Sequence, residues 1–263
     1  MGGNGRLCRK HMEQSIIYSK SYASESETDA YREITELFSR CPIPDSEILA
    51  NLALFMNRSS LSDLLFMHNL YQRIINVHGV VFEFGTRWGR NLALFSIFRT
   101  LYEPHNFFRK IVGFDTFAGF PSVSEMDGAA ESVAEGVLSV TPEYQSYLTQ
   151  LLSAQEKLAP RGHLRKFELI AGDVIETLPA YLEENPETIV ALAYFDMDLY
   201  EPTKRCLDLL KPYLVKGSVI GFDELTIHEY PGETVAFREM LAGSRLQRDP
   251  IASHQSFVVI EGG

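Results

Sequence analysis

Two pairs of carboxylates stand out in the C-terminal half of the sequence. Asp196 and Asp198 follow the apolar run IVALAYF, and Asp223 and Glu224 follow the apolar run SVIGF. An amphipathic helical stretch separates the two runs, so we interpret both runs as buried parallel strands joined by a helical crossover. The carboxyl ends of parallel strands meet at one edge of a sheet, where open α/β sheets bind ligands. The acidic side chains are therefore either a coincidence of surface charge or a metal site.

The residue types favour a hard cation. Carboxylates that share a crevice repel one another unless a cation or a proton lies between them. Divalent cations such as Mg²⁺ take oxygen ligands and usually keep positions open for substrate. The three cysteines, Cys8, Cys41 and Cys206, have no metal-like spacing, which argues against structural zinc and indicates reduced thiols.

A glycine-bearing turn, GTRWGRN, follows an earlier apolar run, GVVFEF. Glu83, Gly85 and Gly89 form the pattern acidic-x-Gly-x-x-x-Gly between a predicted strand and a predicted helix. Glycine at such a turn permits close approach of the backbone to a ligand. The third glycine of a dinucleotide-binding G-x-G-x-x-G is missing, and no P-loop Gly-Lys-Ser/Thr is present. The simpler alternative is that these glycines only serve a tight turn.

Two more acids end predicted strands. Asp115 ends KIVGFD, at a position where ribose hydroxyls need a carboxylate acceptor in such folds. Asp173 follows FELIAG, and its alternative role is to cap the next helix. Acids at three successive strand ends favour a nucleoside site over any one of them alone.

The elements that must position these residues alternate along the chain. From His78 onward, strand and helix patterns alternate five times, which predicts a doubly wound, mostly parallel α/β sheet. The tail RLQRDPIASHQSFVVIEG predicts two more strands at an antiparallel edge. Helical patterns between Tyr31 and about Tyr71 predict an N-terminal helical cap. We therefore divide the chain into a tail with a cap, 1–77, and a main domain, 78–263.

One connection is unusually long. About 25 residues follow Asp115 before the next helical pattern, which is too long for an ordinary strand–helix connection and predicts a mobile lid. We expect the helix after it to begin with Thr141 as its N-cap and Pro142 in its first turn.

Composition excludes several kinds of partner. The chain of 263 residues has a formal net charge of -11 and no basic cluster, which disfavours nucleic acid and anionic membrane surfaces. No apolar run approaches the roughly 20 residues that span a membrane, and the N-terminus lacks the apolar core of a signal peptide. We expect a cytoplasmic protein that acts on a small molecule.

Four stretches together resemble the macrocin/mycinamicin O-methyltransferase family: VVFEFGTRWGRN, GFDTFAGFP, YFDMDLYEPTKRCLDLLKPYL and GFDELTIHEYPGETVAFREM. The resemblance covers about residues 60 to 241. The family consists of metal-dependent class I methyltransferases that act on deoxysugars of natural products. The resemblance implies a Rossmann-like fold, S-adenosylmethionine and Mg²⁺ or a similar divalent cation as cofactors, and a homo-oligomer. Where the family commonly has two aspartates, this chain has Asp223 and Glu224.

The resemblance also implies site residues by position. The metal ligands would be Asp196, Asp223 and Glu224. The residues that line the S-adenosylmethionine pocket would be Glu83, Gly85, Thr86, Arg87, Gly89, Asn91, Asp115, Thr116, Phe117, Gly172, Asp173 and Asp196.

Methyl transfer to a hydroxyl also needs a general base near the acceptor oxygen. We favour Asp196, with His228 second and Asp198 as a further alternative. The leading hypothesis is an S-adenosylmethionine- and Mg²⁺-dependent O-methyltransferase acting on a deoxysugar of a macrolide-type or enediyne-type product. The alternatives are an O-methyltransferase of catechol-like phenols and a noncatalytic S-adenosylmethionine-binding protein.

Overall fold

The computed structural model describes residues 23–252 and 254–261. Contacts divide the chain into two compact units, Met1–Arg58 and Ser59–Gly263. This boundary lies earlier than the sequence-based one at residue 77, because helix α3 (Arg58–Ile74) packs in the core of the larger unit. None of the described helices is long and apolar enough to cross a membrane.

The described part of the smaller unit is helical, as predicted. It contains α1 (Glu25–Ser39), α2 (Asp45–Ile48) and the 3₁₀ helix η1 (Leu49–Phe55). Ser24 and Glu27 form a capping box at the start of α1, in which each side chain accepts a backbone N–H of the other residue. No residue of these three elements is buried.

The larger unit is built on a seven-stranded sheet with the order β3-β2-β1-β4-β5-β7-β6. The first five strands in this order are parallel, and β7 runs antiparallel to both β5 and β6. The predicted doubly wound sheet with an antiparallel C-terminal edge is confirmed. The strands are β1 (Val80–Phe84), β2 (Ile111–Asp115), β3 (Phe167–Ala171), β4 (Val190–Phe195), β5 (Leu214–Phe222), β6 (Leu246–Arg248) and β7 (Ser256–Val259).

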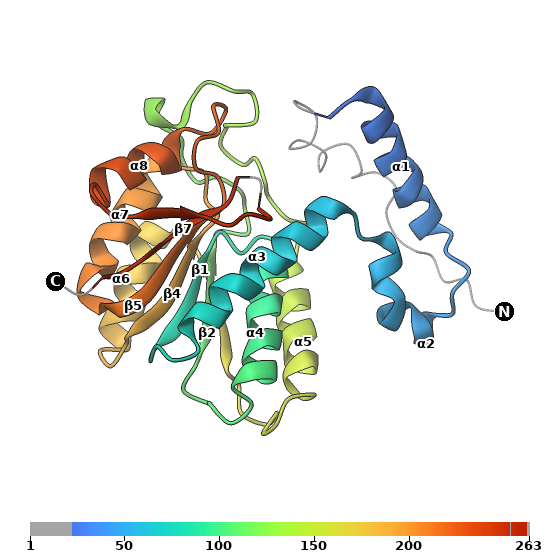
Figure 1. The fold of residues 1–263 in the computed structure, drawn as a ribbon, viewed down its shortest axis with the longest axis horizontal. Coiled ribbons are helices and arrows are strands. Elements are labelled where there is room, and N and C mark those ends of the chain that lie inside the picture. Colours follow the sequence, from blue (N-terminus) through green and yellow to red (C-terminus); the bar gives the residue numbers. More distant parts are fainter. Residues whose placement is uncertain (1–22, 253, 262–263) are drawn as a thin grey trace. The chain divides into compact units, whose positions relative to one another are not determined.

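Helices cover both faces of this sheet (Figure 1). One face packs against α3, α4 (Arg90–Tyr102) and α5 (Tyr144–Glu156). The other face packs against α6 (Val174–Glu184), α7 (Tyr200–Leu210) and α8 (Gly232–Met240). The central strands are therefore buried on both faces, which explains their nearly continuous apolar sequences. The unit also contains two short 3₁₀ helices, η2 (Glu125–Asp127) and η3 (Lys211–Tyr213).

A row of phenylalanines aligns the three central strand ends. Phe84, Phe195 and Phe222 pair in register across β1, β4 and β5. Their ring centroids lie 4.9 Å apart between the first two and 5.4 Å apart between the last two. All three rings are fully buried, and each such burial contributes about 1.5–3 kcal/mol. The next residues on β4 and β5, Asp196 and Asp223, are thereby fixed at one edge.

The predicted start of α5 is wrong. The helix begins at Tyr144, after Glu143 with a left-handed φ of 64°, and Thr141 does not cap it. Tyr144, the first residue of the helix, also contacts the glycine turn, because its hydroxyl donates to the carbonyl of Trp88 at 2.9 Å. The two rings also meet edge to face, with their centroids 4.7 Å apart.

Candidate active site

The candidate site lies where the strand order reverses, between β1 and β4. Here the first residue after β1 is Gly85, with φ of 91°. A Cβ at this position would lie 1.8 Å from the carbonyl oxygen of Asp196. The Asp196 N–H in turn donates to the carbonyl of Phe84 at 2.8 Å. Glycine therefore lets the ends of β1 and β4 meet, at the position where doubly wound sheets bind ligands.

The turn between β1 and α4 brings several predicted residues to this point. Thr86 and Asn91 are buried, and Arg87 has a left-handed φ of 45°. Gly89 precedes α4 as its N-cap, also with a left-handed φ. The side-chain amide of Asn91 donates to the carboxylate of Asp196, with 3.4 Å between the two atoms. The turn is therefore linked directly to the end of β4.

Glu83 is the least satisfied polar residue of this region. Its side chain is buried, and neither carboxylate oxygen has a hydrogen-bond partner among the described residues. Burial, with a smaller contribution from the charge of Asp115, raises the pKa of Glu83 to about 8. The Thr86 hydroxyl and Nε of Arg87 are also buried without a partner. Such atoms usually have a partner in a folded protein, so the turn fits a polar ligand such as S-adenosylmethionine.

Asp115 ends β2 and organises two turns. Its carboxylate accepts the N–H of Arg87 at 2.6 Å and that of Phe117 at 2.5 Å. Burial raises the pKa of Asp115, although these two N–H groups oppose the shift. The Thr116 hydroxyl donates to the carbonyl of Gly119 at 2.6 Å and shapes the same turn. Carboxylate oxygens have about four lone-pair directions, so Asp115 can still accept from ribose hydroxyls.

Asp173 acts as a helix cap. Its carboxylate accepts the N–H of Ile175 at 2.9 Å at the start of α6. Gly172, just before it, donates its N–H to the carbonyl of Asp115 at 2.9 Å. The capping alternative is confirmed, and a contact from Asp173 to a cofactor stays a prediction.

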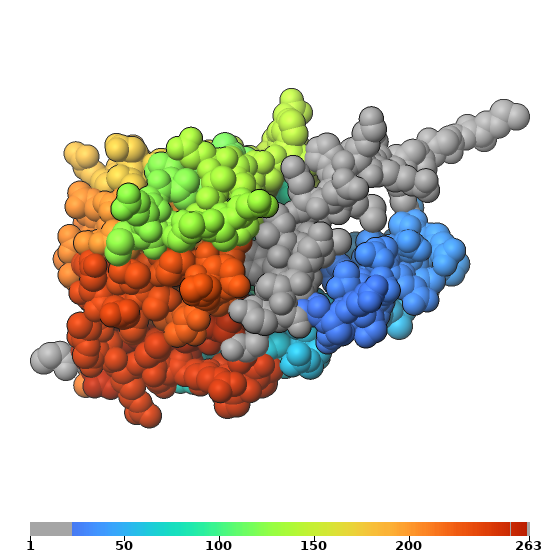
Figure 2. All heavy atoms as spheres, turned by 90° about the horizontal axis from the view of Figure 1, so that it is seen from above, coloured from blue at the N-terminus to red at the C-terminus, as the bar shows by residue number. Residues whose placement is uncertain are grey.

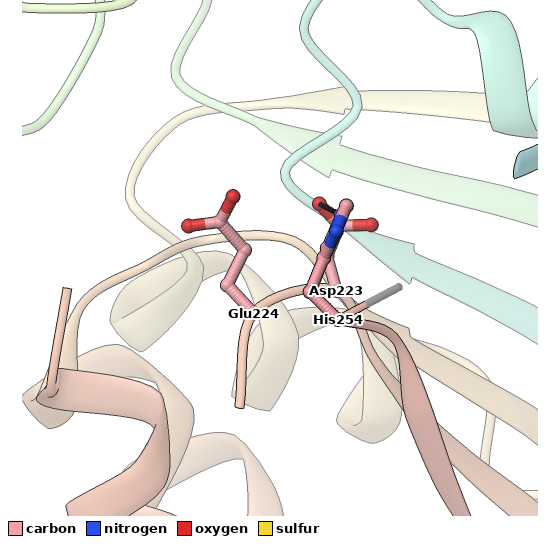
Figure 3. A group of neighbouring side chains, drawn as sticks. All are labelled: Asp223, Glu224 and His254. Carbon is pink, nitrogen blue, oxygen red and sulfur yellow. Dashed lines mark ion pairs between the residues drawn. The ribbon is translucent and has the colours of Figure 1, made fainter. Parts of the chain in front are cut away.

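Three ligand-type side chains converge at the end of β5. One ligand atom each of Asp223, Glu224 and His254 lies within 4.8 Å of the others. Figure 3 shows these side chains directed to the same side of the strand end. Glu224 is buried, whereas Asp223 and His254 are half-buried. Two carboxylates and an imidazole suit a divalent cation, so the residues present fit the predicted metal.

Asp196 is not one of these three residues, but it interacts with them electrostatically. Burial raises the pKa of Asp196 well above its usual value, and the charges of Asp223, Asp198, Glu224 and Glu233 add to the shift. Neighbouring ionised carboxylates repel one another, and a cation or a shared proton relieves the repulsion. The two acidic strand ends predicted from the sequence therefore belong to one electrostatic cluster.

A polar network holds Asp223 in place. The Tyr194 hydroxyl donates to its carboxylate at 2.6 Å, and the Gln255 amide donates to the same oxygen at 3.1 Å. Gln255 also donates to Asp63 on α3 at 3.1 Å, and Arg90 donates to the other oxygen of Asp63 at 3.0 Å. Residues of α3, α4, β4 and the segment before β7 thus orient one carboxylate.

A second histidine, His254, lies beside the cluster, and a role of His228 as general base stays a prediction. His228 lies exposed between β5 and α8 and is not in the three-residue group. Instead, Nε2 of His254 lies 4.0 Å from a carboxylate oxygen of Asp223. The pairing of Phe222 with Ser256 brings the segment before β7 alongside the end of β5. The sequence predicted this antiparallel edge but not its register, so it did not indicate His254 or Gln255.

A buried carboxylate also anchors the long segment between β2 and α5. Asp127 accepts the backbone N–H of Tyr200 at the start of α7, and both the N–H and the hydroxyl of Ser124 at 2.7 Å. Figure 2 shows the segment 116–143, in green, lying along the orange and red C-terminal part of the same unit. The middle of this segment is therefore held to the start of α7, the helix that follows Asp196 and Asp198.

This fold and site define a class I S-adenosylmethionine-dependent methyltransferase. The sheet has the nucleotide-binding strand order 3-2-1-4-5, extended by an antiparallel β7. A glycine turn, a buried acid on β1 and an acid at the end of β2 surround the switch point.

Comparisons with known proteins agree with this class. No protein-family model matches the sequence, and no curated protein matches it. A crystal structure of CalS11, a calicheamicin methyltransferase, is 43% identical, with a TM-score of 0.88 over 90% of this chain and 94% of its own. An apo structure of CalS11, described as a TDP-rhamnose 3'-O-methyltransferase of calicheamicin biosynthesis, is 41% identical, with a TM-score of 0.80 over 90% and 96%. The O-methyltransferase NovP shares the fold at 21% identity, with a TM-score of 0.59 over 76% and 80%.

The chain therefore belongs to the family of class I S-adenosylmethionine-dependent O-methyltransferases that includes CalS11. It is an S-adenosylmethionine-dependent methyltransferase.

Proposed function

We propose that this enzyme methylates a hydroxyl of a deoxysugar, carried by a nucleotide or by a glycosylated natural product, with the help of a divalent cation. The observation that carries the proposal is the acidic cluster at the ends of β4 and β5, directly beside the glycine turn. The likeness to CalS11 supports the substrate class, because that protein is described as acting on TDP-rhamnose. Catechol-like phenols, the alternative acceptors, have no such support.

The donor side of the site is formed by β1, β2 and their turns. S-adenosylmethionine, when bound, supplies a methyl group on a positively charged sulfur. The negative charge that burial disfavours on Glu83 becomes favourable beside a cationic ligand. Asp115, held by two backbone N–H groups, accepts from the ribose hydroxyls. The remaining predicted pocket residues lie in the same turns, with Asp173 and Gly172 at the neighbouring strand end.

The acceptor side is formed by the acidic cluster. Asp196, Asp223 and Glu224 would hold the cation, and His254 lies beside Asp223. When bound, the cation orients the sugar hydroxyl and lowers its pKa. Asp196 lies between the two sides, since it also contacts Asn91 of the glycine turn.

Asp196 is therefore placed to accept the hydroxyl proton. The C–O bond forms as the C–S bond breaks, and the products are the methyl ether and S-adenosylhomocysteine.

A panel assay tests the proposal. The purified enzyme is incubated with methyl-labelled S-adenosylmethionine, Mg²⁺ and a set of deoxysugar nucleotides, glycosides and catechols. We expect label in a deoxysugar-bearing acceptor and not in the catechols. Transfer to catechols alone would overturn the substrate class. Failure to bind S-adenosylmethionine would overturn the donor site as well.

A further inference from the structure

Glu233 is a fully buried carboxylate in the first turn of α8, and the methyl-transfer chemistry described above gives it no role. One of its oxygens accepts the backbone N–H of Met197 at 3.1 Å and that of Asp198 at 3.3 Å. These two residues immediately follow Asp196 at the end of β4. Its other oxygen is buried without a hydrogen-bond partner among the described residues. Because α8 follows β5 in the chain, this side chain links the helix after one acidic strand end to the backbone that follows the other.

The local backbone is shaped for this interaction. Asp198 has a left-handed φ of 65°, and the N–H groups of Met197 and Asp198 converge on one carboxylate oxygen. Successive N–H groups that point the same way form an anion-binding concavity. A Cβ at Gly232 would lie 2.7 Å from the carbonyl oxygen of Asp198 and 2.6 Å from the N atom of Tyr200. Glycine at this position therefore allows α8 to approach closely enough for Glu233 to reach the turn.

We propose that Glu233 is a positioning residue that sets the separation between the carboxylate of Asp196 and those of Asp223 and Glu224. The inference rests on the proposed function and deepens it, because that separation decides whether one cation can bind both strand ends. Backbone hydrogen bonds to a buried carboxylate are charge-assisted and stronger than neutral ones. Partners of this kind, one step behind the ligands, commonly control metal affinity.

Stability and positioning make opposite demands on this residue. Burying a carboxylate beside other carboxylates is unfavourable, because the group loses water and faces like charges. For Glu233, the two unfavourable effects are the loss of water on burial and the negative charge of Asp223, and both raise its pKa. A glutamine of the same shape avoids both costs but removes the negative charge that strengthens the two backbone hydrogen bonds. If Glu233 positions the strand ends, Glu233→Gln leaves the fold intact and weakens the metal site.

Metal titration of variants tests the inference. Mn²⁺ binding is measured by electron paramagnetic resonance for the wild type, Glu233→Gln and Glu239→Gln. Glu239 is the matched control, because it lies on the same helix but pairs at the surface with Lys204 at 2.7 Å. We expect Mn²⁺ affinity to fall about tenfold or more in Glu233→Gln, with kcat lowered at saturating metal. S-adenosylmethionine affinity should stay within about twofold, Tm should not fall, and Glu239→Gln should bind Mn²⁺ as the wild type does.

Two results would overturn the positioning role. One is wild-type Mn²⁺ affinity in a folded Glu233→Gln variant. The other is a joint loss of Tm, cofactor affinity and metal affinity, which is the signature of a purely structural residue. If Glu233→Gln does not fold, Glu233→Asp takes its place, since its shorter side chain keeps the charge but not the reach. Absence of Mn²⁺ binding by the wild type would instead overturn the metal site of the proposed function, and this inference with it.

Discussion

At the scale of single residues, three side chains surround the carboxylate of Asp223. It accepts from Tyr194 and Gln255, and His254 lies beside its second oxygen. The imidazole of His254 therefore lies beside the proposed cation site, whereas His228 is exposed to solvent.

This difference predicts unequal effects for the two histidines. His254→Asn should lower kcat by about tenfold or more, the range for residues that support a metal or a proton transfer. His228→Asn should change kcat by less than about threefold, as expected of a surface substitution. Steady-state kinetics with saturating S-adenosylmethionine and Mg²⁺ measure both. A larger loss of kcat in His228→Asn than in His254→Asn would favour His228 as the catalytic histidine.

Glu83 makes stability depend on pH. Its pKa is raised from 4.5 to about 8 in the folded state, so between these values the folded state binds a proton that the unfolded state has released. The contribution of Glu83 to the free energy of unfolding is therefore greatest below pH 4.5, and it falls as the pH rises from 4.5 towards 8. A single proton contributes a slope of at most about 1.4 kcal/mol per pH unit.

Glu83→Gln should remove this part of the slope. Urea unfolding of the cofactor-free protein at several pH values between 5.5 and 8.5 measures it, with Glu183→Gln on the exposed side of α6 as the control. An unchanged slope in Glu83→Gln would mean that the carboxyl of Glu83 is already ionised at neutral pH in the folded protein.

At the scale of elements, the segment 116–143 depends on Asp127. The predicted lid is anchored at this residue, because its carboxylate bridges Ser124 and the N–H of Tyr200. The movement of a lid stays a prediction.

Asp127→Asn replaces one acceptor oxygen with a donor and should cost the anchor about 1–3 kcal/mol. We expect faster hydrogen exchange across 116–143 and a KM for the acceptor raised several-fold. Hydrogen exchange followed by mass spectrometry measures the first effect, with Glu131→Gln in the same segment as the control. Exchange rates equal to those of the wild type would show that other contacts hold the segment.

The limits of sequence-based prediction also follow from the elements. Local patterns indicated the strands, the glycine turn and the acids at strand ends, because apolar runs and turn residues act over a few positions. His254, Gln255, Asp127 and Glu233 reach the site through pairings between segments far apart in the chain. Thr141 does not cap α5, because the helix begins at Tyr144, after the left-handed Glu143.

At the scale of the whole molecule, the sheet works as a platform with two sides. The reversal of strand order between β1 and β4 separates the proposed donor side, made of β1 and β2, from the proposed acceptor side, made of β4 and β5. Asp196 lies at their common boundary, since it contacts Asn91 on one side and interacts with Asp223 on the other. In the described part of the smaller unit, apolar side chains such as Leu49 and Leu54 are exposed, and the homo-oligomer implied by the resemblance stays a prediction.

The most direct measurement is metal-dependent methyl transfer to a deoxysugar nucleotide. We predict that the wild type transfers label from S-adenosylmethionine with Mg²⁺, loses this activity with EDTA and regains it when Mg²⁺ is restored. Asp196→Asn should reduce turnover by about a hundredfold or more while S-adenosylmethionine affinity stays within about tenfold. Sustained methyl transfer in EDTA would contradict the metal dependence, and full turnover by Asp196→Asn would contradict the role of Asp196.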